Sequence, residues 1–211
     1  MKVNEIYRSV QGESSYSGLP CVFVRLTYCH LRCSYCDTEY AFYDGQDYTV
    51  NEVLEKIHDF DCSLVEITGG EPLLQEESYP LMDRLVERNY TVLLETSGSL
   101  NIQKVNSKVI RIIDLKCPSS GECHRNLYSN LNELNRQDEV KFVVGDRNDY
   151  QWARKLLYDY DLTDRCSVLL STVFGKLSTQ QLVKWILEDN LKVRFQLQMH
   201  KYIWDPCKKS V

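Results

Sequence analysis

Residues 29–36 read CHLRCSYC and place three cysteines at C-x3-C-x2-C spacing. They follow residues 21–26, a β-branched and aromatic run that is typical of a strand, so the cysteines are expected on a loop at that strand's end. Thiolates are soft ligands that suit zinc or an iron–sulfur cluster. Structural zinc usually takes four protein ligands, and no second Cys or His pair stands nearby at finger spacing. Three thiolates on an iron–sulfur cubane would leave one iron open for a substrate or cofactor. A chance grouping of buried cysteines is the weaker interpretation.

Strand-like and helix-like stretches alternate along the rest of the chain. Beyond residues 21–26, strands are expected at 63–68, 91–95, 109–115, 139–144, 166–170 and 193–197, and helices at 50–60, 78–89, 148–160 and 179–188, with a weaker helix at 127–135. Thr49 is expected to cap the first helix, and Ser178 with Gln181 to form a capping box. This alternation favours a parallel sheet with helices packed outside it. With about six or seven strands the chain is too short for a full eight-fold barrel. We therefore expect one α/β domain over residues 1–211, a partial β/α barrel with mostly parallel strands.

The composition excludes several classes of protein. The 211 residues include 25 Lys plus Arg against 30 Asp plus Glu, and the net charge of −5 argues against broad nucleic-acid binding. Neither a membrane span nor a secretion signal is expected, because the chain has no apolar run of about 18 residues and no apolar segment near its start. An odd count of nine cysteines then indicates reduced thiols in a cytoplasmic protein.

Polar or glycine-rich residues follow several of the expected strands. They include Gly69-Gly70-Glu71, Thr96-Ser97-Gly98 and Lys116. Because right-handed crossovers bring the carboxyl ends of parallel strands to one edge, these residues and the cysteine loop are expected to share a site.

The cysteine loop resembles the signature of the radical S-adenosylmethionine superfamily, with Tyr35 just before the last ligand. The resemblance implies that Cys29, Cys33 and Cys36 hold a [4Fe-4S] cluster whose open iron binds S-adenosylmethionine, and that one-electron reduction releases a 5′-deoxyadenosyl radical. The run 69–72, GGEP, is similar to the superfamily's second motif. Contacts to S-adenosylmethionine are implied for Gly70, Glu71, Lys116, Ser171 and Phe174.

Across essentially the whole chain, further segments resemble one family, the 7-carboxy-7-deazaguanine synthases. These segments are residues 6–13, 95–98, 114–118 and 198–202. The family is a group of carbon–nitrogen lyases in 7-deazapurine, or queuosine-type, biosynthesis. The implied reaction contracts the ring of 6-carboxy-5,6,7,8-tetrahydropterin to 7-carboxy-7-deazaguanine with loss of ammonia.

The same resemblance implies roles for single residues and for partners. Arg25 would hold the substrate carboxylate, for which a planar guanidinium is suited, and the Thr38 hydroxyl would bind Mg²⁺. The substrate contacts implied by the family are Val10, Gln11, Gly12, Arg25, Thr68, His200 and Pro206. A flavodoxin-type reductant and a homodimer are also implied. Ser14 departs from the family, which commonly has glycine at that position.

Two other functions remain open from the sequence. A glycyl-radical-enzyme activase also uses a three-cysteine loop in a chain of this length, but would need a surface that receives a protein substrate. A non-catalytic iron–sulfur or zinc regulatory protein is the second alternative. Metal analysis separates them, since about one zinc per chain and no iron would exclude radical chemistry.

Overall fold

A nine-stranded, mostly parallel sheet forms the centre of the computed structural model, which describes residues 1–206 and 208–211. Its spatial order is β3-β1-β2-β4-β5-β6-β7-β8-β9. β1 is antiparallel to both β2 and β3, and the strands from β2 through β9 are parallel to one another. The strands are β1 (Lys2–Val10), β2 (Pro20–Leu26), β3 (Gln46–Asp47), β4 (Leu64–Gly69), β5 (Thr91–Thr96), β6 (Ile110–Leu115), β7 (Glu139–Val144), β8 (Ser167–Thr172) and β9 (Arg194–Phe195).

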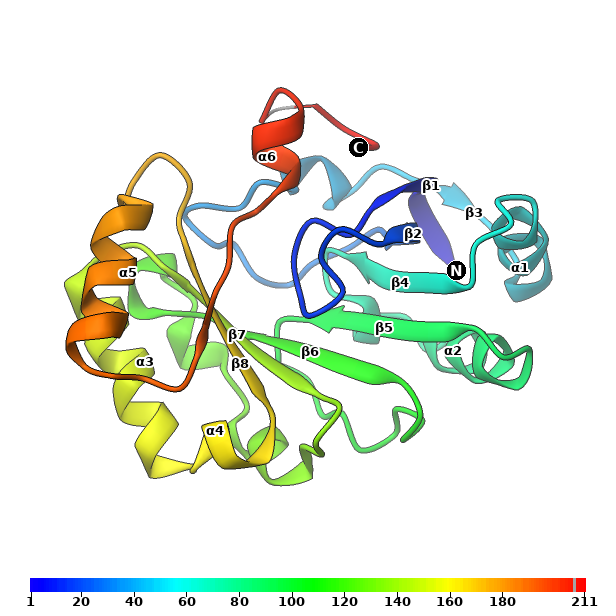
Figure 1. Ribbon diagram of the computed structural model, residues 1–211. Helices are drawn as coiled ribbons and strands as arrows, with labels where there is room; N and C mark the ends of the chain where they lie inside the picture. Colours follow the sequence, from blue (N-terminus) through cyan, green and yellow to red (C-terminus); the bar gives the residue numbers. More distant parts are fainter. Residues whose placement is uncertain (207) are drawn as a thin grey trace.

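The helices α1 to α5 cover the outer side of the curved sheet, and α6 lies apart from them, next to the loop that follows β1 (Figure 1). The helices are α1 (Val50–His58), α2 (Ser78–Glu87), α3 (Arg147–Asp159), α4 (Leu162–Arg165), α5 (Thr179–Glu188) and α6 (His200–Ile203), with short 3₁₀ turns η1 (Glu39–Ala41), η2 (Pro72–Leu74), η3 (Pro118–Ser120), η4 (Cys123–Arg125) and η5 (Tyr128–Glu133). The sheet stays open, so the expected partial barrel is confirmed. Within the described residues, none of the helices is long and apolar enough to cross a membrane.

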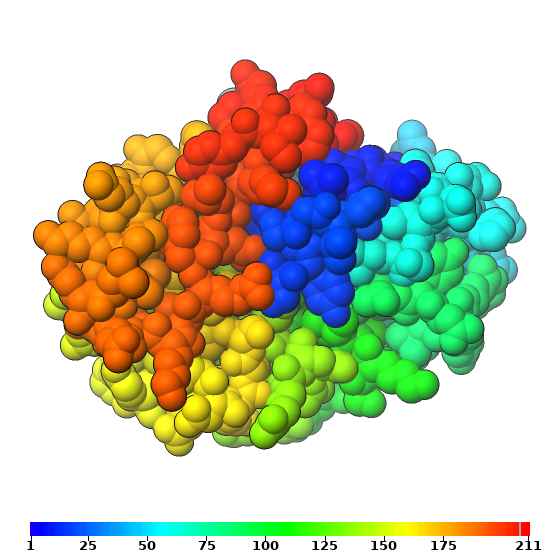
Figure 2. Space-filling model, viewed as in Figure 1, coloured from blue at the N-terminus to red at the C-terminus, as the bar shows by residue number. Residues whose placement is uncertain are grey.

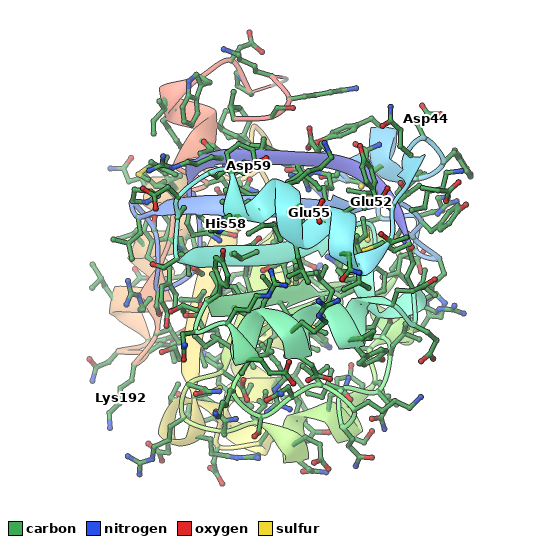
Figure 3. All side chains as sticks on the ribbon, turned by 90° about the vertical axis from the view of Figure 1, so that its right-hand side faces the viewer. Asp44, Glu52, Glu55, His58, Asp59 and Lys192 are labelled. Atoms are coloured by element: carbon green, nitrogen blue, oxygen red, sulfur yellow. The ribbon has the colours of Figure 1, made fainter. Side chains whose placement is uncertain are left out.

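The two predicted helix caps have different outcomes. The Thr49 hydroxyl accepts a hydrogen bond from the Glu52 amide while the Glu52 carboxylate accepts one from the Thr49 amide, so α1 begins with a full capping box. The exposed side of α1 carries Glu52, Glu55 and His58 (Figure 3). At α5 the predicted capping box is wrong, since the Ser178 side chain makes no cap bond and the Gln181 amide bonds to the Ser178 carbonyl oxygen instead.

Apart from unexpected elements of two to four residues, three elements differ from the sequence-based expectation. Residues 2–10 form β1, which was not expected as a strand. The weak helix expected at 127–135 is the 3₁₀ segment η5, where the Asn130 amide donates to the carbonyls of Gly98 and Leu100 and so binds the segment to the loop after β5. The last strand is only two residues long, and the side chain of Gln196, which follows it, bonds both backbone groups of Ser14.

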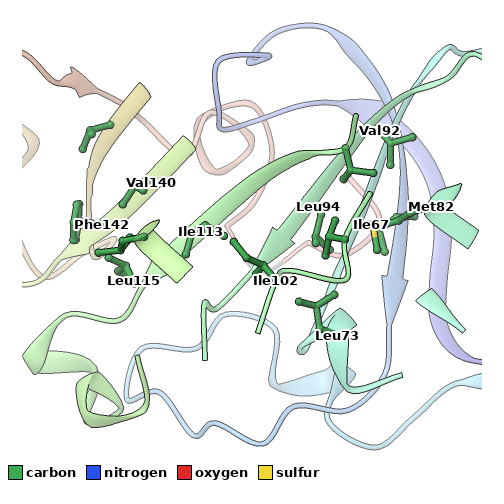
Figure 4. Close-up of a cluster of buried hydrophobic side chains, with 14 of the residues drawn as sticks. Ile67, Leu73, Met82, Val92, Leu94, Ile102, Ile113, Leu115, Val140 and Phe142 are labelled. Atoms are coloured by element: carbon green, nitrogen blue, oxygen red, sulfur yellow. The ribbon is translucent and has the colours of Figure 1, made fainter. Parts of the chain in front are cut away.

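Alternate residues of each strand face opposite sides of the sheet. The outward side packs against the helices and forms the main core (Figure 4), which includes Ile67, Val92, Leu94, Ile113, Val140 and Phe142. The inward side is apolar only toward the amino ends of the strands, where its residues are Cys21, Phe23, Leu64, Leu93, Ile110 and Ile112. Toward the carboxyl ends it carries charge, at Arg25, Glu66, Glu95, Asp114 and Lys141. This charged layer sits beneath the cysteine loop.

The loop of residues 11–19, between β1 and β2, lies across the open side of the sheet. It contacts the segment after β9 through Ser14 and Gln196, and the two lie side by side in Figure 2. The Glu139 carboxylate accepts the Ser15 amide at 3.0 and 3.1 Å. Ser14 has a φ of 61°, in the left-handed region that favours glycine. A glycine would adopt this conformation without the steric cost that a serine bears.

Candidate functional site

Fourteen of the sixteen residues predicted for the site line one cavity of about 660 Å³ at the carboxyl ends of the strands. They are Val10, Gln11, Gly12, Arg25, Cys29, Cys33, Cys36, Thr38, Thr68, Gly70, Lys116, Phe174, His200 and Pro206. Glu71 and Ser171 are buried next to it but do not line it. Residues from both ends of the chain therefore meet at the edge where the sequence placed the site.

The cysteine loop is held by its own backbone contacts and by one arginine. The Arg32 guanidinium donates to the carbonyls of Cys29 and Leu31, both at 2.7 Å, and stacks 4.2 Å above the Phe42 ring. Farther along, the Ser34 amide donates to the Ser120 carbonyl oxygen at 2.9 Å. These contacts, together with a hydrogen bond from the Leu31 amide to Cys29 Sγ, hold the loop in one shape.

The three thiols suit an iron–sulfur cluster. All three are partly buried and line the cavity, and burial raises the pKa of Cys33 to about 11 and raises that of Cys29 and Cys36. Iron binding would therefore release their protons. Among the described residues, no three His, Cys, Asp or Glu side chains are arranged to hold one metal ion. A cubane does not need that arrangement, because each protein ligand binds a different iron.

The glycine pair after β4 is required by close packing against the cysteine loop. Gly69 has a φ of 133°, and a Cβ there would lie 2.1 Å from the Leu26 carbonyl oxygen. A Cβ on Gly70 would lie 2.1 Å from the Tyr28 carbonyl oxygen and 2.9 Å from the Cys29 Cβ. No L side chain fits at these distances, so Gly69 and Gly70 allow the two loops to meet at the cavity wall.

Glu71 supports this glycine loop from inside the protein. Its fully buried carboxylate accepts hydrogen bonds from the Thr96 hydroxyl at 2.8 Å, from the Ser97 amide and hydroxyl at 2.8 and 2.5 Å, and from the Leu73 amide at 3.1 Å. The carboxylate is thus occupied by protein donors. A contact of Glu71 with S-adenosylmethionine stays a prediction, and its side chain positions Gly70 instead of lining the cavity.

Arg25 enters the cavity from β2 and is oriented by β1. Its Nε donates to Glu5 Oε1 at 2.6 Å and its Nη2 to the Tyr7 hydroxyl at 3.0 Å. The Tyr40 hydroxyl donates to the same Glu5 oxygen at 2.9 Å. β1 therefore positions the predicted carboxylate-binding residue, and the sequence reasoning missed both Glu5 and Tyr7.

The C-terminal segment covers the cavity. The Met199 amide donates to the Gly12 carbonyl oxygen at 2.9 Å, and a Cβ on Gly12 would lie 2.5 Å from the His200 Nδ1. Lys201 Nζ contacts Asp37 Oδ2 at 2.7 Å. Burial lowers the pKa of His200, so its imidazole is neutral near pH 7. The segment that carries two predicted substrate contacts, His200 and Pro206, thus lies on the cysteine loop and on residues 11–13.

Lys116 and Ser171 are both predicted to contact S-adenosylmethionine, and they differ in exposure. Lys116 Nζ contacts Asp114 Oδ2 at 2.9 Å and lines the cavity. Ser171 is 2% exposed, and its hydroxyl is buried without a hydrogen-bond partner among the described residues. The contacts of both with S-adenosylmethionine stay predictions.

A network of buried charges, which the sequence reasoning also missed, forms the cavity floor. Lys141 Nζ lies 2.6 Å from a Glu95 oxygen, 3.0 Å from Glu13 and 3.6 Å from Asp114. Burial alone would lower the pKa of Lys141, but these carboxylates outweigh it and raise that pKa. Burial raises the pKa of Glu95 to about 7. A polar residue inside an otherwise apolar strand, as in VEIT and EVKFVV, was the signal available in the sequence.

Comparisons with known proteins agree with this geometry. The sequence pattern of the Radical SAM superfamily matches residues 24–116. The chain is 46% identical to a 7-carboxy-7-deazaguanine synthase of Koribacter versatilis, with both chains covered fully, and 44% identical to that of Chlorobaculum tepidum over 100% of this chain and 97% of the relative. In fold it is similar to QueE from Escherichia coli, with a TM-score of 0.76 at 22% identity, covering 92% of this chain and 93% of the other.

Proposed function

The chain belongs to the 7-carboxy-7-deazaguanine synthase family of the radical SAM superfamily, and from this membership we propose that it converts 6-carboxy-5,6,7,8-tetrahydropterin to 7-carboxy-7-deazaguanine with loss of ammonia. Its cofactors are a [4Fe-4S] cluster, S-adenosylmethionine and Mg²⁺. Bound together, the cluster and S-adenosylmethionine supply the adenosyl radical that takes a hydrogen atom from the substrate.

The observation that carries the proposal is the single cavity shared by the three cysteines, Arg25, Thr38 and His200. Its volume of about 660 Å³ is within the range of small-molecule sites. The cover formed by α6 and the following residues favours a small substrate over the protein substrate of an activase. A regulatory metal site would not need this enclosed space.

The proposed work of the chain's own residues is to bind and orient the substrate and S-adenosylmethionine and to shield the radical. We propose that Arg25, oriented by Glu5 and Tyr7, binds the substrate carboxylate through its remaining N–H groups. We propose that the C-terminal segment limits the access of water to the cavity, which would keep a radical from side reactions. Gly70, whose backbone reaches the cavity between the two loops, is the proposed contact to the amino group of S-adenosylmethionine.

We expect the anaerobic, cluster-containing enzyme to form 7-carboxy-7-deazaguanine when given reductant, S-adenosylmethionine, Mg²⁺ and 6-carboxytetrahydropterin. Liquid chromatography with mass detection measures this product and 5′-deoxyadenosine together. Formation of 5′-deoxyadenosine alone would contradict the substrate and leave the radical chemistry in place. A protein that binds zinc and no iron would contradict both.

Thr38→Ala should weaken the response of turnover to added Mg²⁺ and keep its iron. Thr38 lines the cavity and its hydroxyl donates to Asp37 at 3.0 Å, so its removal takes away the proposed oxygen ligand while Asp37 keeps its contact with Lys201. We expect Mg²⁺ to act at a concentration raised about 10-fold or more. Thr49→Ala, which removes the cap of α1 outside the cavity, is the matched control. An unchanged Mg²⁺ response in Thr38→Ala would remove this residue from the metal site.

We further propose a flavodoxin-type reductant, a homodimer, a single domain over residues 1–211 and a cytoplasmic location. A low-potential cluster and a reduced electron donor both need a reducing compartment, which supports that location. The continuous sheet from β1 to β9 supports the single domain. Sedimentation of the cluster-containing protein tests the dimer.

A further inference from the structure

Glu66 is a buried acid on the cavity wall to which neither the family resemblance nor the charge network gives a role. It lies on β4, and its side chain faces the inward side of the sheet. Thr68, the next inward-facing residue toward the carboxyl end of β4, is paired in register with Arg25 on β2. Two residues of a strand span roughly 6.6 Å. The Glu66 side chain is 5% exposed and lines the cavity. Glu66 therefore marks a deeper part of the cavity than the level at which Arg25 enters.

No cation pairs with Glu66 in the part of the chain that the structure describes, although cations are close. Lys141 forms ion pairs with Glu13, Glu95 and Asp114, and Arg25 forms one with Glu5. The partner of Glu66 is the Gln11 amide, whose Nε2 donates to Oε2. Burial and the neighbouring Glu95 raise the pKa of Glu66 well above its ordinary value. An uncompensated carboxyl group in this position costs stability unless a ligand supplies donors to it.

We propose that Glu66 is a specificity-determining residue that accepts hydrogen bonds from the 2-amino end of the pterin ring. This inference rests on the proposed function. A 2-amino-4-oxo pyrimidine ring offers two neighbouring N–H groups, at the exocyclic amine and at N3, and a carboxyl group can accept both in parallel. Arg25, bound by Glu5 and Tyr7 of β1, would take the carboxylate at the other end of the substrate. Gln11 orients Glu66 from the side and is fixed itself, since its Oε1 accepts the Glu13 amide at 2.7 Å.

A pair of stable acids tests this role without turnover. Pterin-6-carboxylate carries the 2-amino group, and lumazine-6-carboxylate carries a 2-oxo group, an acceptor, in its place. Both are titrated by calorimetry into cluster-containing, unreduced enzyme with S-adenosylmethionine and Mg²⁺ present. The wild type should bind the pterin about 10- to 100-fold more tightly, the range expected for a hydrogen bond to a charged group.

Glu66→Gln should abolish or reverse this preference, because an amide offers one acceptor and one donor and so matches the lumazine. The ratio of the two affinities does not depend on the fraction of folded protein, so a loss of stability does not mimic the result. Glu139→Gln is the matched control, since Glu139 is an equally buried inward acid outside the cavity that bonds to Ser15. It should keep the wild-type ratio.

Two outcomes would overturn the inference, and they are distinguishable. If the wild type prefers the pterin and Glu66→Gln keeps the same preference, Glu66 only supports Gln11 and the proposed function stands. If the wild type binds neither acid, the proposed function fails and the inference fails with it.

Discussion

Cys29→Ala should abolish turnover and lose most of the iron, leaving the fold intact. Cys29 is one of three thiols that line the cavity, and its structural contact is a 3.4 Å hydrogen bond from the Leu31 amide to Sγ. Changes to residues that merely support a metal ligand already cost about 10- to 100-fold in metal affinity, so loss of one of three ligands should cost more than about 100-fold. Iron analysis after anaerobic reconstitution and the cluster's visible absorbance measure this directly.

Cys62→Ala is the matched control. Cys62 is partly buried just before β4, where its thiol contacts the Pro20 carbonyl oxygen at 3.3 Å, and it does not line the cavity. It should retain about four irons per chain, the content expected of the wild type. If Cys29→Ala keeps its iron, or if Cys62→Ala loses as much, the cluster is not held by the cysteine loop. Urea unfolding of both variants separates loss of metal from loss of fold.

The cysteine loop and the glycine pair were predictable because each rests on local chemistry. Metal-ligand spacing can be read within eight residues, and two consecutive glycines signal a close approach of backbone. Within the chain itself, Gly69 packs against Leu26 at the end of β2, and Gly70 packs against Tyr28 and Cys29. The sequence could not show which residues the glycines approach, because Tyr28 and Cys29 lie about forty residues before Gly70 in the chain.

The inward charges were missed for a different reason. A strand of a parallel sheet is usually buried on both faces and reads as continuously apolar. The sequence therefore assigns Glu66 and Lys141 to strands but does not indicate which face of the sheet they occupy or what they contact. Their role depends on several strands at once, because Lys141 on β7 reaches Glu95 on β5 and Asp114 on β6. β1 was missed because its apolar residues do not alternate with polar ones, and with it the two side chains that orient Arg25. Glu71 was placed at the ligand by its motif alone; its buried carboxylate supports the loop from behind, and its contact with S-adenosylmethionine stays a prediction.

The buried charge network leads to the second large prediction, that Lys141→Met is destabilised by about 3–5 kcal/mol near pH 8, the cost typical of leaving a buried charge without its partner. Lys141 is 6% exposed and is the cation shared by Glu13, Glu95 and Asp114. Methionine keeps most of its length and removes its charge. Anaerobic urea titration of the cluster-containing protein measures the free energy of unfolding.

The loss should be smaller at pH 5.5, because carboxyl groups left without Lys141 can then take up protons. Glu95 already has a pKa of about 7 against an ordinary 4.5. A carboxyl whose pKa is raised by folding binds more protons in the folded state, so its contribution to stability is greatest below 4.5 and is lost as pH rises through about 7. Removing Lys141 raises that pKa further and steepens the loss toward pH 8. Lys155→Met, which breaks an exposed pair with Asp159 on α3, should cost less than about 0.5 kcal/mol at either pH. Equal, pH-independent losses in the two variants would mean that Lys141 contributes only its hydrocarbon chain.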